Sequence, residues 1–171
     1  MIIPYGKGKH AIKKFNILNF GSGHAGFSIL SSLSNHSITN FDFFINEELI
    51  NNPHITQIND LKRTSKKFDL IYASHSLEHV MNIKETIKSL LNISHKETIF
   101  FFEVPNCFNE KQKKIKAPHT YYFTRDFFMK LFLDNFNCET WKNSKKCSND
   151  EGDIIRVYGK FRPSINFLNN I

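Results

Sequence analysis

Short apolar runs alternate with amphipathic segments along most of the chain. The runs are rich in Ile, Leu and Phe, and their length is typical of strands buried in a sheet. They predict strands at residues 15–20, 38–42, 55–58, 68–73, 98–104, 138–141 and 154–161. Apolar residues at helical spacing between these runs predict helices at residues 24–33, 47–52 and 83–91, and a further helix that begins after Thr124.

The order of these elements predicts the fold class. Strands and helices alternate over most of the chain, which is the pattern of an open α/β sheet. The last two strands follow one another without a helix between them. We therefore expect them to form an antiparallel hairpin at the edge of the sheet. No repeat or linker divides the chain, so a single domain over residues 1–171 is predicted, with residues 1–14 as a short lead-in.

Three glycines lie in the turn that connects the first strand to the first helix. Gly21, Gly23 and Gly26 follow the apolar run directly. Glycine permits positive φ and lets a ligand approach the backbone closely. The N–H groups that begin the following helix suit a carboxylate or a phosphate. The turn is interpreted as a cradle for a nucleotide-like cofactor, and a purely structural turn is the alternative.

Polar residues follow the next three predicted strands. Asp42 ends the second strand, Asp60 follows the third, and residues 74–79 follow the fourth. Ligands of open α/β sheets bind at the carboxyl ends of the strands, so these positions are expected to meet. Asp42 is expected to accept hydrogen bonds from ribose hydroxyls, and Asp60 or a neighbouring backbone group to reach an adenine edge. A turn residue and a helix cap are the structural alternatives for the two acids.

Two of these segments carry a family resemblance. Residues 17–23, ILNFGSG, and residues 68–80, FDLIYASHSLEHV, resemble motifs of class I S-adenosylmethionine-dependent methyltransferases of the small methyltransferase-domain type. Residues 104–106 and 119–124 are similar to segments after the fifth strand of that family. The resemblance implies a Rossmann-like, mostly parallel sheet of seven strands, with the last strand antiparallel and helices on both faces. It also implies S-adenosyl-L-methionine as cofactor and a small-molecule, sugar or lipid-type methyl acceptor.

The resemblance also suggests roles for individual residues. His119 is the candidate base where the acceptor must lose a proton, because imidazole titrates near the working pH. A histidine held by hydrogen bonds within a loop is the alternative. Glu78 and His79 are interpreted as capping and packing the next helix, and no metal ligands are predicted. The residues expected to contact the cofactor are Asn19, Gly21, Ser22, Gly23, Asp42, Asp60, Leu61, Ser74 and His75.

Composition and charge add weaker expectations. The formal net charge is +7, but the lysines are spread along the chain and fit a solvated surface. The three cysteines show no CxxC spacing, which favours reduced thiols over a disulfide framework or a zinc cluster. No apolar run approaches the roughly 20 residues of a membrane span, so a cytoplasmic protein is expected. The lysine-rich stretch 111–116 lacks an aromatic-interleaved recognition motif, so nucleic acid is not an expected partner.

Two other functions fit parts of the pattern. The three glycines and Asp42 also match the dinucleotide fingerprint of an NAD-dependent oxidoreductase, although a second mononucleotide unit is not obvious. A non-catalytic, degenerate methyltransferase-fold partner subunit is the other alternative, because Asn19 stands where the family usually has an acid and few residues precede the first strand. A protein partner or a second copy of the chain is therefore expected to complete the pocket. Residues 106–118 and 119–123 are the expected lid.

Overall fold

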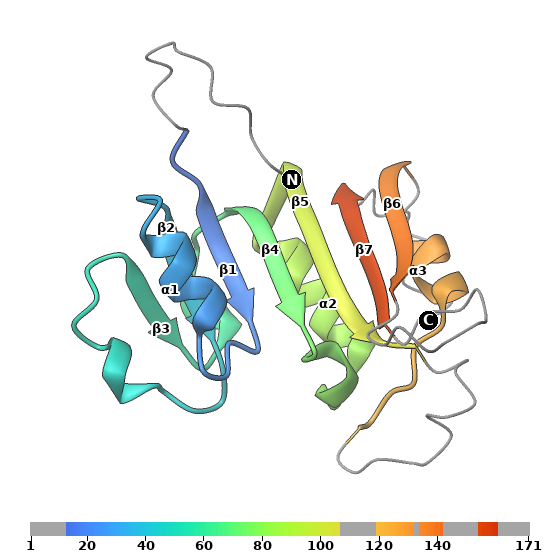
Figure 1. Ribbon diagram of the computed structural model, residues 1–171, viewed down its shortest axis with the longest axis horizontal. Helices are drawn as coiled ribbons and strands as arrows, with labels where there is room; N and C mark the ends of the chain where they lie inside the picture. Colours follow the sequence, from blue (N-terminus) through green and yellow to red (C-terminus); the bar gives the residue numbers. More distant parts are fainter. Residues whose placement is uncertain (1–12, 107–118, 132–133, 142–153, 161–171) are drawn as a thin grey trace.

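All seven predicted strands join one sheet in a computed structural model, which describes residues 13–106, 119–131, 134–141 and 154–160 (Figure 1). The strand order is β3-β2-β1-β4-β5-β7-β6. Strand β7 pairs antiparallel with both of its neighbours, and the other pairs are parallel. The predicted fold class is confirmed. The strands are β1 (Asn16–Phe20), β2 (Ser37–Phe41), β3 (Ile55–Ile58), β4 (Phe68–Ser74), β5 (Ser94–Pro105), β6 (Asp134–Trp141) and β7 (Ile154–Lys160).

Three α-helices and three 3₁₀ turns connect the described strands. Helix α2 begins after Asn82, whose side chain accepts a hydrogen bond from the Glu85 backbone N–H at 3.1 Å and so caps the first turn. None of the described helices is long and apolar enough to cross a membrane. The elements are α1 (Gly26–Ser32), α2 (Ile83–Asn92), α3 (Arg125–Leu131), η1 (Glu47–Leu49), η2 (Leu61–Arg63) and η3 (Leu77–His79).

Two helix boundaries differ from the prediction. Helix α1 begins at Gly26 rather than near residue 24, because Ala25 adopts a left-handed conformation with φ of 59°. The helix expected at residues 47–52 is a 3₁₀ turn of three residues, capped by the side chain of Asn46. Residues 1–12 of the predicted lead-in (residues 1–14) and residues 107–118 of the predicted lid lie outside the described residues.

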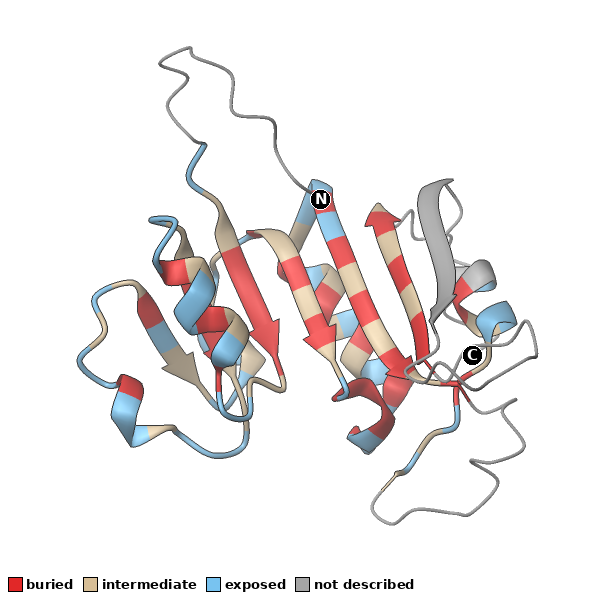
Figure 2. Ribbon diagram, viewed as in Figure 1, coloured by how far each residue is buried: buried red, intermediate tan, exposed pale blue. Residues whose placement is uncertain are grey.

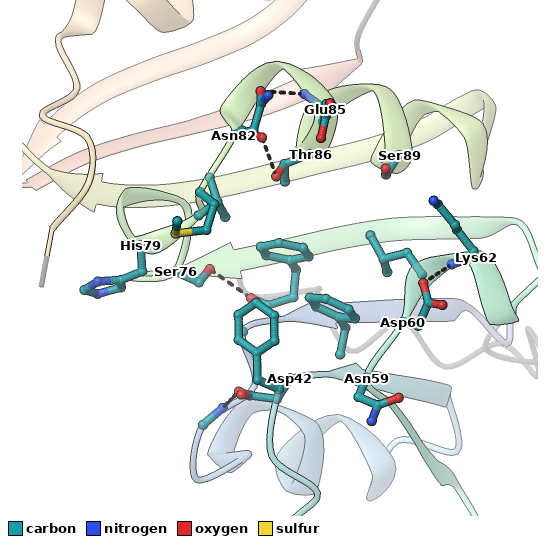
Figure 3. Close-up of a pocket in the computed structure, with 18 of the residues that line it drawn as sticks. Asp42, Asn59, Asp60, Lys62, Ser76, His79, Asn82, Glu85, Thr86 and Ser89 are labelled. Atoms are coloured by element: carbon teal, nitrogen blue, oxygen red, sulfur yellow. Dashed lines mark hydrogen bonds between the residues drawn. The ribbon is translucent and has the colours of Figure 1, made fainter.

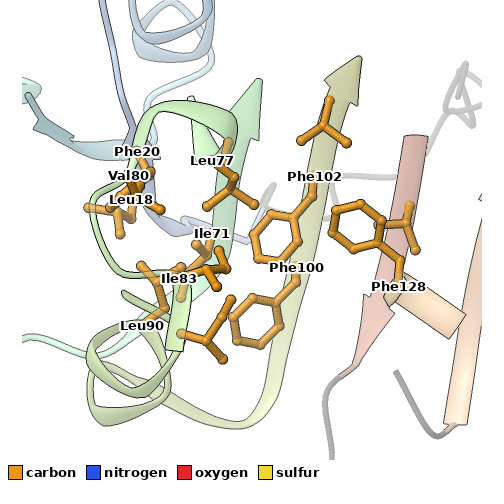
Figure 4. Packing of buried hydrophobic residues seen from close by; sticks show 14 of the residues in the cluster. Leu18, Phe20, Ile71, Leu77, Val80, Ile83, Leu90, Phe100, Phe102 and Phe128 are labelled. Carbon is orange, nitrogen blue, oxygen red and sulfur yellow. The ribbon is translucent and has the colours of Figure 1, made fainter. Parts of the chain in front are cut away.

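The main hydrophobic core lies between the sheet and helices α2 and α3, on the face opposite α1 (Figures 1 and 4). Buried residues alternate with more exposed ones along residues 98–105 of β5 and along β7, as Figure 2 shows, because successive side chains of a strand point to opposite faces. The core is built around aromatic and branched side chains, among them Leu18, Ile71, Leu90, Phe100, Phe102 and Phe128.

A row of aromatic rings crosses the α1 face of the sheet. Phe27 of α1 stacks on Tyr72 with ring centroids 3.9 Å apart, Tyr72 stacks on Phe101 at 5.2 Å, and Phe101 stacks on Tyr158 at 6.4 Å. Helix α1 packs against the β1–β2 side of this face (Figure 1). The row continues beyond it, and Tyr72, Phe101 and Tyr158 are only partly buried.

Candidate functional site

The glycine turn after β1 needs glycine for two different reasons. Gly21 has φ of +69°, and a Cβ added to it would lie 2.2 Å from the Cβ of Ser76. Its glycine therefore permits close packing of the turn against the segment that follows β4. Gly23 has φ of +49°, but a Cβ there would meet nothing within 4 Å among the described residues. The turn thus leaves open space in front of Gly23.

Asp42 holds this turn in place from the end of β2. Its Oδ2 accepts a hydrogen bond from the backbone N–H of Gly23 at 2.8 Å. The Phe41 carbonyl accepts two more bonds, from the N–H groups of Gly21 at 2.8 Å and Ser22 at 3.2 Å. The carboxylate therefore lies beside the glycines, where the sequence placed it, and it has a structural contact there as well.

A cavity of about 580 Å³ opens between the glycine turn, η2, η3 and the start of α2 (Figure 3). This volume lies in the range of small-ligand pockets, about 300–1,000 Å³. The cavity wall includes six of the nine residues expected to contact the cofactor: Gly21, Gly23, Asp42, Asp60, Leu61 and His75.

The other three expected residues do not line the cavity and take part in hydrogen bonds elsewhere. Asn19 is buried, and its Nδ2 donates to the hydroxyl of Ser28 in α1 at 2.8 Å. The Ser28 hydroxyl in turn donates to the Asn40 side chain. Ser22 takes part in the turn through its backbone N–H. Ser74 donates its hydroxyl to Glu103 Oε1 at 2.9 Å.

Several lining residues were not anticipated from the sequence. Phe20 and Phe41 end β1 and β2, and their rings stack with centroids 4.9 Å apart. Their position at the carboxyl ends of two parallel strands is the signal that could have identified them. On α2, the lining residues come from the polar side of the helix, which amphipathic spacing also predicts. Ser76 and His79 belong to the segment 74–79 that was expected at this edge of the sheet. The remaining unanticipated residues are Phe43, Asn59, Lys62, Val80, Met81, Asn82, Glu85, Thr86 and Ser89.

Charged groups gather where the cavity meets the end of β4. His75 has φ of +50°, an uncommon conformation for a residue with a side chain. Its Nδ1 lies 3.5 Å from Glu78 Oε1, and its Nε2 lies 3.6 Å from Glu103 Oε1. A hydrogen bond with Glu78 raises the pKa of His75 against the opposing effect of burial. The His75 imidazolium is therefore favoured beside the cavity.

Glu103 belongs to the same group of charges. Burial alone would raise the pKa of its carboxyl, but hydrogen bonds from Arg156 and Ser74 hold that pKa below its usual value. Nε of Arg156 donates to Glu103 Oε2 at 2.9 Å, and Nη2 donates to the same oxygen. The ends of β4, β5 and β7 are tied together by these contacts.

His119, the candidate base, lies at the edge of this group and does not line the cavity. Its ring centroid is 4.9 Å from that of His79, which does line it. The next two backbone N–H groups, of Thr120 and Tyr121, donate to the Glu78 carbonyl at 2.7 and 3.1 Å. The described part of the predicted lid is thereby already hydrogen-bonded to η3.

Glu78 differs from its expected role. Asn82 caps α2, whereas Glu78 forms part of η3 and is 1% exposed. One ligand atom from each of Glu78, His79 and His119 lies within 4.8 Å of the other two. No local pattern could have shown this cluster, because His119 is forty residues from His79 in the chain.

Comparisons of the sequence and of the fold with known proteins both find methyltransferases. The model of a family described as a methyltransferase domain matches residues 6–143. A structure of an S-adenosylmethionine-dependent methyltransferase from Archaeoglobus fulgidus has a TM-score of 0.62 and 17% identity, with 86% of each chain covered. One from Mesorhizobium loti has a TM-score of 0.62 and 14% identity, covering 86% of this chain and 91% of that chain.

Similarity also extends to a larger protein. Coclaurine N-methyltransferase bound to N-methylheliamine and SAH has a TM-score of 0.57 and 13% identity, covering 76% of this chain and 48% of that chain. The present chain thus spans about half the length of that protein. A search of curated proteins found no match. At these identities the solved structures establish a shared fold.

Proposed function

The chain belongs to the methyltransferase-domain family, and on this premise we propose that it is an S-adenosylmethionine-dependent methyltransferase whose acceptor is a small molecule with an apolar part. The acceptor would bind at the η3–α2 end of the cavity. This narrows the small-molecule, sugar or lipid-type acceptors that the sequence left open.

The residues around the glycine turn fit the cofactor. Gly23 faces open space that a side chain would occupy, and Asp42 and Asp60 bring carboxylates to the same cavity. These three residues and Leu61 would hold the cofactor. When bound, S-adenosylmethionine supplies an activated sulfonium methyl group, so the chemical reactivity is the cofactor's own.

The extent of the cavity carries the proposal. It runs past the expected cofactor residues to the polar side of α2, where Glu85, Thr86 and Ser89 form its wall. Phe43 and Met81 also line it and are 74% and 85% exposed. Exposed apolar side chains at the wall of a pocket suit the apolar part of a ligand. The polar groups of α2 would orient the remainder of the acceptor.

The contribution of the protein to methyl transfer is mainly positioning. Holding an acceptor at near-attack distance can supply about 7–11 kcal/mol of the barrier in favourable systems. The wall formed by η3 and α2 would fix the acceptor, and apolar Val80 and Met81 would limit water. The base role of His119 stays a prediction. His119 does not line the cavity itself, and its ring lies beside the ring of His79, which does.

The acceptor class can be tested with labelled cofactor. A cell extract is separated into a small-molecule filtrate and a macromolecular fraction, and each is incubated with protein and S-adenosylmethionine labelled in the methyl group. We expect protein-dependent label in the filtrate, extractable into organic solvent. Met81→Lys should raise the KM for that acceptor and leave S-adenosylhomocysteine binding unchanged. Label confined to the macromolecular fraction would contradict the proposal.

The same experiment addresses the alternatives. A non-catalytic subunit would transfer no label to either fraction. The NAD-dependent alternative is disfavoured by the antiparallel β7 between β5 and β6, since the dinucleotide fold is built from two parallel mononucleotide-binding halves. Tight NAD binding with no response to S-adenosylhomocysteine would restore it.

A further inference from the structure

We propose that Glu78, His79 and His119 form a binding site for a divalent first-row transition metal ion, such as Zn²⁺, at the edge of the cavity. One ligand atom from each residue lies within 4.8 Å of the other two. Two imidazole nitrogens and one carboxylate oxygen are a ligand set that zinc and related ions use in proteins. Mg²⁺ and Ca²⁺ prefer oxygen ligands alone, so the two histidines favour a transition metal.

The buried carboxylate is the first argument for an ion. Glu78 is 1% exposed, and its Oε2 has no hydrogen-bond partner within the described part of the chain. A buried carboxylate oxygen without a partner is unfavourable, and such groups are normally paired or bound to a metal. His75 and His79 both lie nearest to Oε1, at 3.5 and 3.8 Å. Oε1 is therefore the oxygen on the His79 side, and an ion held by both carboxylate oxygens would also satisfy Oε2.

The backbone around the cluster brings the distant histidine to the carboxylate. The Glu78 carbonyl accepts hydrogen bonds from the N–H groups of Thr120 and Tyr121. The Tyr121 hydroxyl donates to the Met81 carbonyl and accepts from the N–H of Ile83, both at 3.2 Å. These bonds fix the segment that carries His119 against η3. Its approach to Glu78 and His79 follows from this anchoring.

The two imidazoles can complete the site by small movements. Donor atoms around an ion with metal–ligand bonds of about 2.1 Å lie roughly 3.4 Å apart in tetrahedral geometry. The three donors must therefore move closer together than their present spread of up to 4.8 Å. Glu78 is buried and fixed, but the His79 side chain is 38% exposed. The His79 and His119 rings meet edge to face at 72°, with centroids 4.9 Å apart.

Three protein ligands leave coordination positions open, which is typical of catalytic rather than structural metal sites. His79 lines the cavity, so the open positions would face the space assigned to the acceptor. This step rests on the proposed function, whereas metal binding itself does not. An acceptor oxygen bound there would lose its proton more readily. His119 would then act as a metal ligand and not as a free base.

Cobalt provides a direct test, because Co²⁺ commonly replaces Zn²⁺ and reports its coordination by visible absorption. Protein stripped with a chelator is titrated with Co²⁺ by absorption and with Zn²⁺ by calorimetry. We expect one ion per chain with low-symmetry Co²⁺ bands. His79→Ala and His119→Ala should each weaken binding by at least about tenfold. His95→Ala is the matched control, since His95 lies 3.4 Å from Asp69, away from the cluster, and should leave binding unchanged.

The result can be separated from misfolding and from the proposed function. Each variant is also titrated with S-adenosylhomocysteine, which should bind with unchanged affinity if the fold is intact. Co²⁺ binding that is absent, or unaffected by His119→Ala, would overturn the metal site whatever the methyl-transfer assay shows. Metal binding without any methyl transfer would instead refute the link to the acceptor. If ligation explains the role of His119, His119→Cys should retain part of the Zn²⁺ affinity that His119→Ala loses.

Discussion

The carboxylate of Asp42 accepts a hydrogen bond from the backbone N–H of Gly23 at 2.8 Å, which joins the end of β2 to the glycine turn after β1. The sequence suggested Asp42 as a ligand for ribose hydroxyls. The structure adds that the same carboxylate orders the backbone on which the cofactor would rest. Substitution of Asp42 therefore has two separable effects, one on the charge and one on the turn.

Asp42→Ala should weaken S-adenosylhomocysteine binding by about 1–3 kcal/mol, the range for losing hydrogen bonds to a charged group. Titration calorimetry is the measurement. Asp42→Asn is the matched control, because its side-chain oxygen can still accept the Gly23 N–H while the charge is removed. If both variants lose the same affinity, the carboxylate charge contributes more to ligand binding than the hydrogen bond to Gly23 does. Unchanged binding by a folded Asp42→Ala would show that Asp42 is only a turn residue.

Gly23→Ala should affect cofactor binding more than folding stability. Positive φ at this position costs an alanine about 1–2 kcal/mol of folding stability. Because the new methyl group would enter the open space in front of the turn, S-adenosylhomocysteine affinity should fall at least about tenfold. Gly26→Ala is the control, since a Cβ there meets nothing within 4 Å and Gly26 lies in α1. An equal loss of affinity in both variants would argue against a specific cradle at Gly23.

Gly21→Ala should act through packing instead. Its Cβ would lie 2.2 Å from the Cβ of Ser76, and overpacking of this kind typically costs about 1–3 kcal/mol. Urea unfolding measures the loss. The double variant Gly21→Ala/Ser76→Gly removes the clash and should recover part of the stability, leaving the cost of positive φ. No recovery in the double variant would mean that the Ser76 contact does not limit this position.

The sequence predicts those features of the structure that depend on residues close together in the chain. All seven strands and the glycine turn were predicted, because apolar runs such as residues 68–73 and three closely spaced glycines are local features. Strands β5 and β6 each begin four residues earlier than expected. The start of α1 was misplaced, because nothing in the sequence marks Ala25 as left-handed. The six expected residues that line the cavity follow strand ends, where topology brings residues together.

The rest of the site depends on contacts between distant segments. The Gly21–Ser76 approach arises only when β1 and β4 become neighbours in the sheet. His119 reaches Glu78 because backbone N–H groups of its own segment bind the Glu78 carbonyl. Hydrophobic periodicity carries no information about such hydrogen bonds. Asn19 was expected near the cofactor, and its bond to Ser28 depends on how α1 packs on β1.

Phe102→Ala should strongly destabilise the fold. Phe102 is 1% exposed and packs between Phe100 and Phe128, with ring centroids 5.7 and 6.3 Å away. Removing a buried phenyl ring typically costs about 3–5 kcal/mol through lost transfer free energy and a residual cavity. Phe43→Ala is the matched control, because Phe43 is 74% exposed and should change the free energy of unfolding by less than about 0.5 kcal/mol. Similar losses in the two variants would contradict the core described between the sheet and α2.

The pairing of Glu103 with Arg156 should make stability depend on acid pH. Hydrogen bonds from Arg156 and Ser74 outweigh the effect of burial and hold the pKa of Glu103 below its ordinary value. The imidazole of His75 faces the same carboxylate, with Nε2 3.6 Å from Oε1. Because the pKa is lower in the folded state, this stabilisation is fully present above the unfolded pKa. It is lost as the pH falls through the folded pKa.

Glu103→Gln should therefore lower the free energy of unfolding at pH 7 by about 1–2 kcal/mol. This is less than the full stabilisation of a buried charged hydrogen bond, because the Arg156 side chain is partly exposed and solvent screens the pair. The difference from the wild type should shrink progressively below pH 4.5. Urea unfolding between pH 3 and pH 7 gives both quantities. Glu97→Gln is the matched control on the same two strands, because Glu97 pairs with Lys160 in solvent, where the pair is screened. A Glu103→Gln difference that stays constant down to pH 3 would show that the carboxylate stabilises the fold through shape and not through charge.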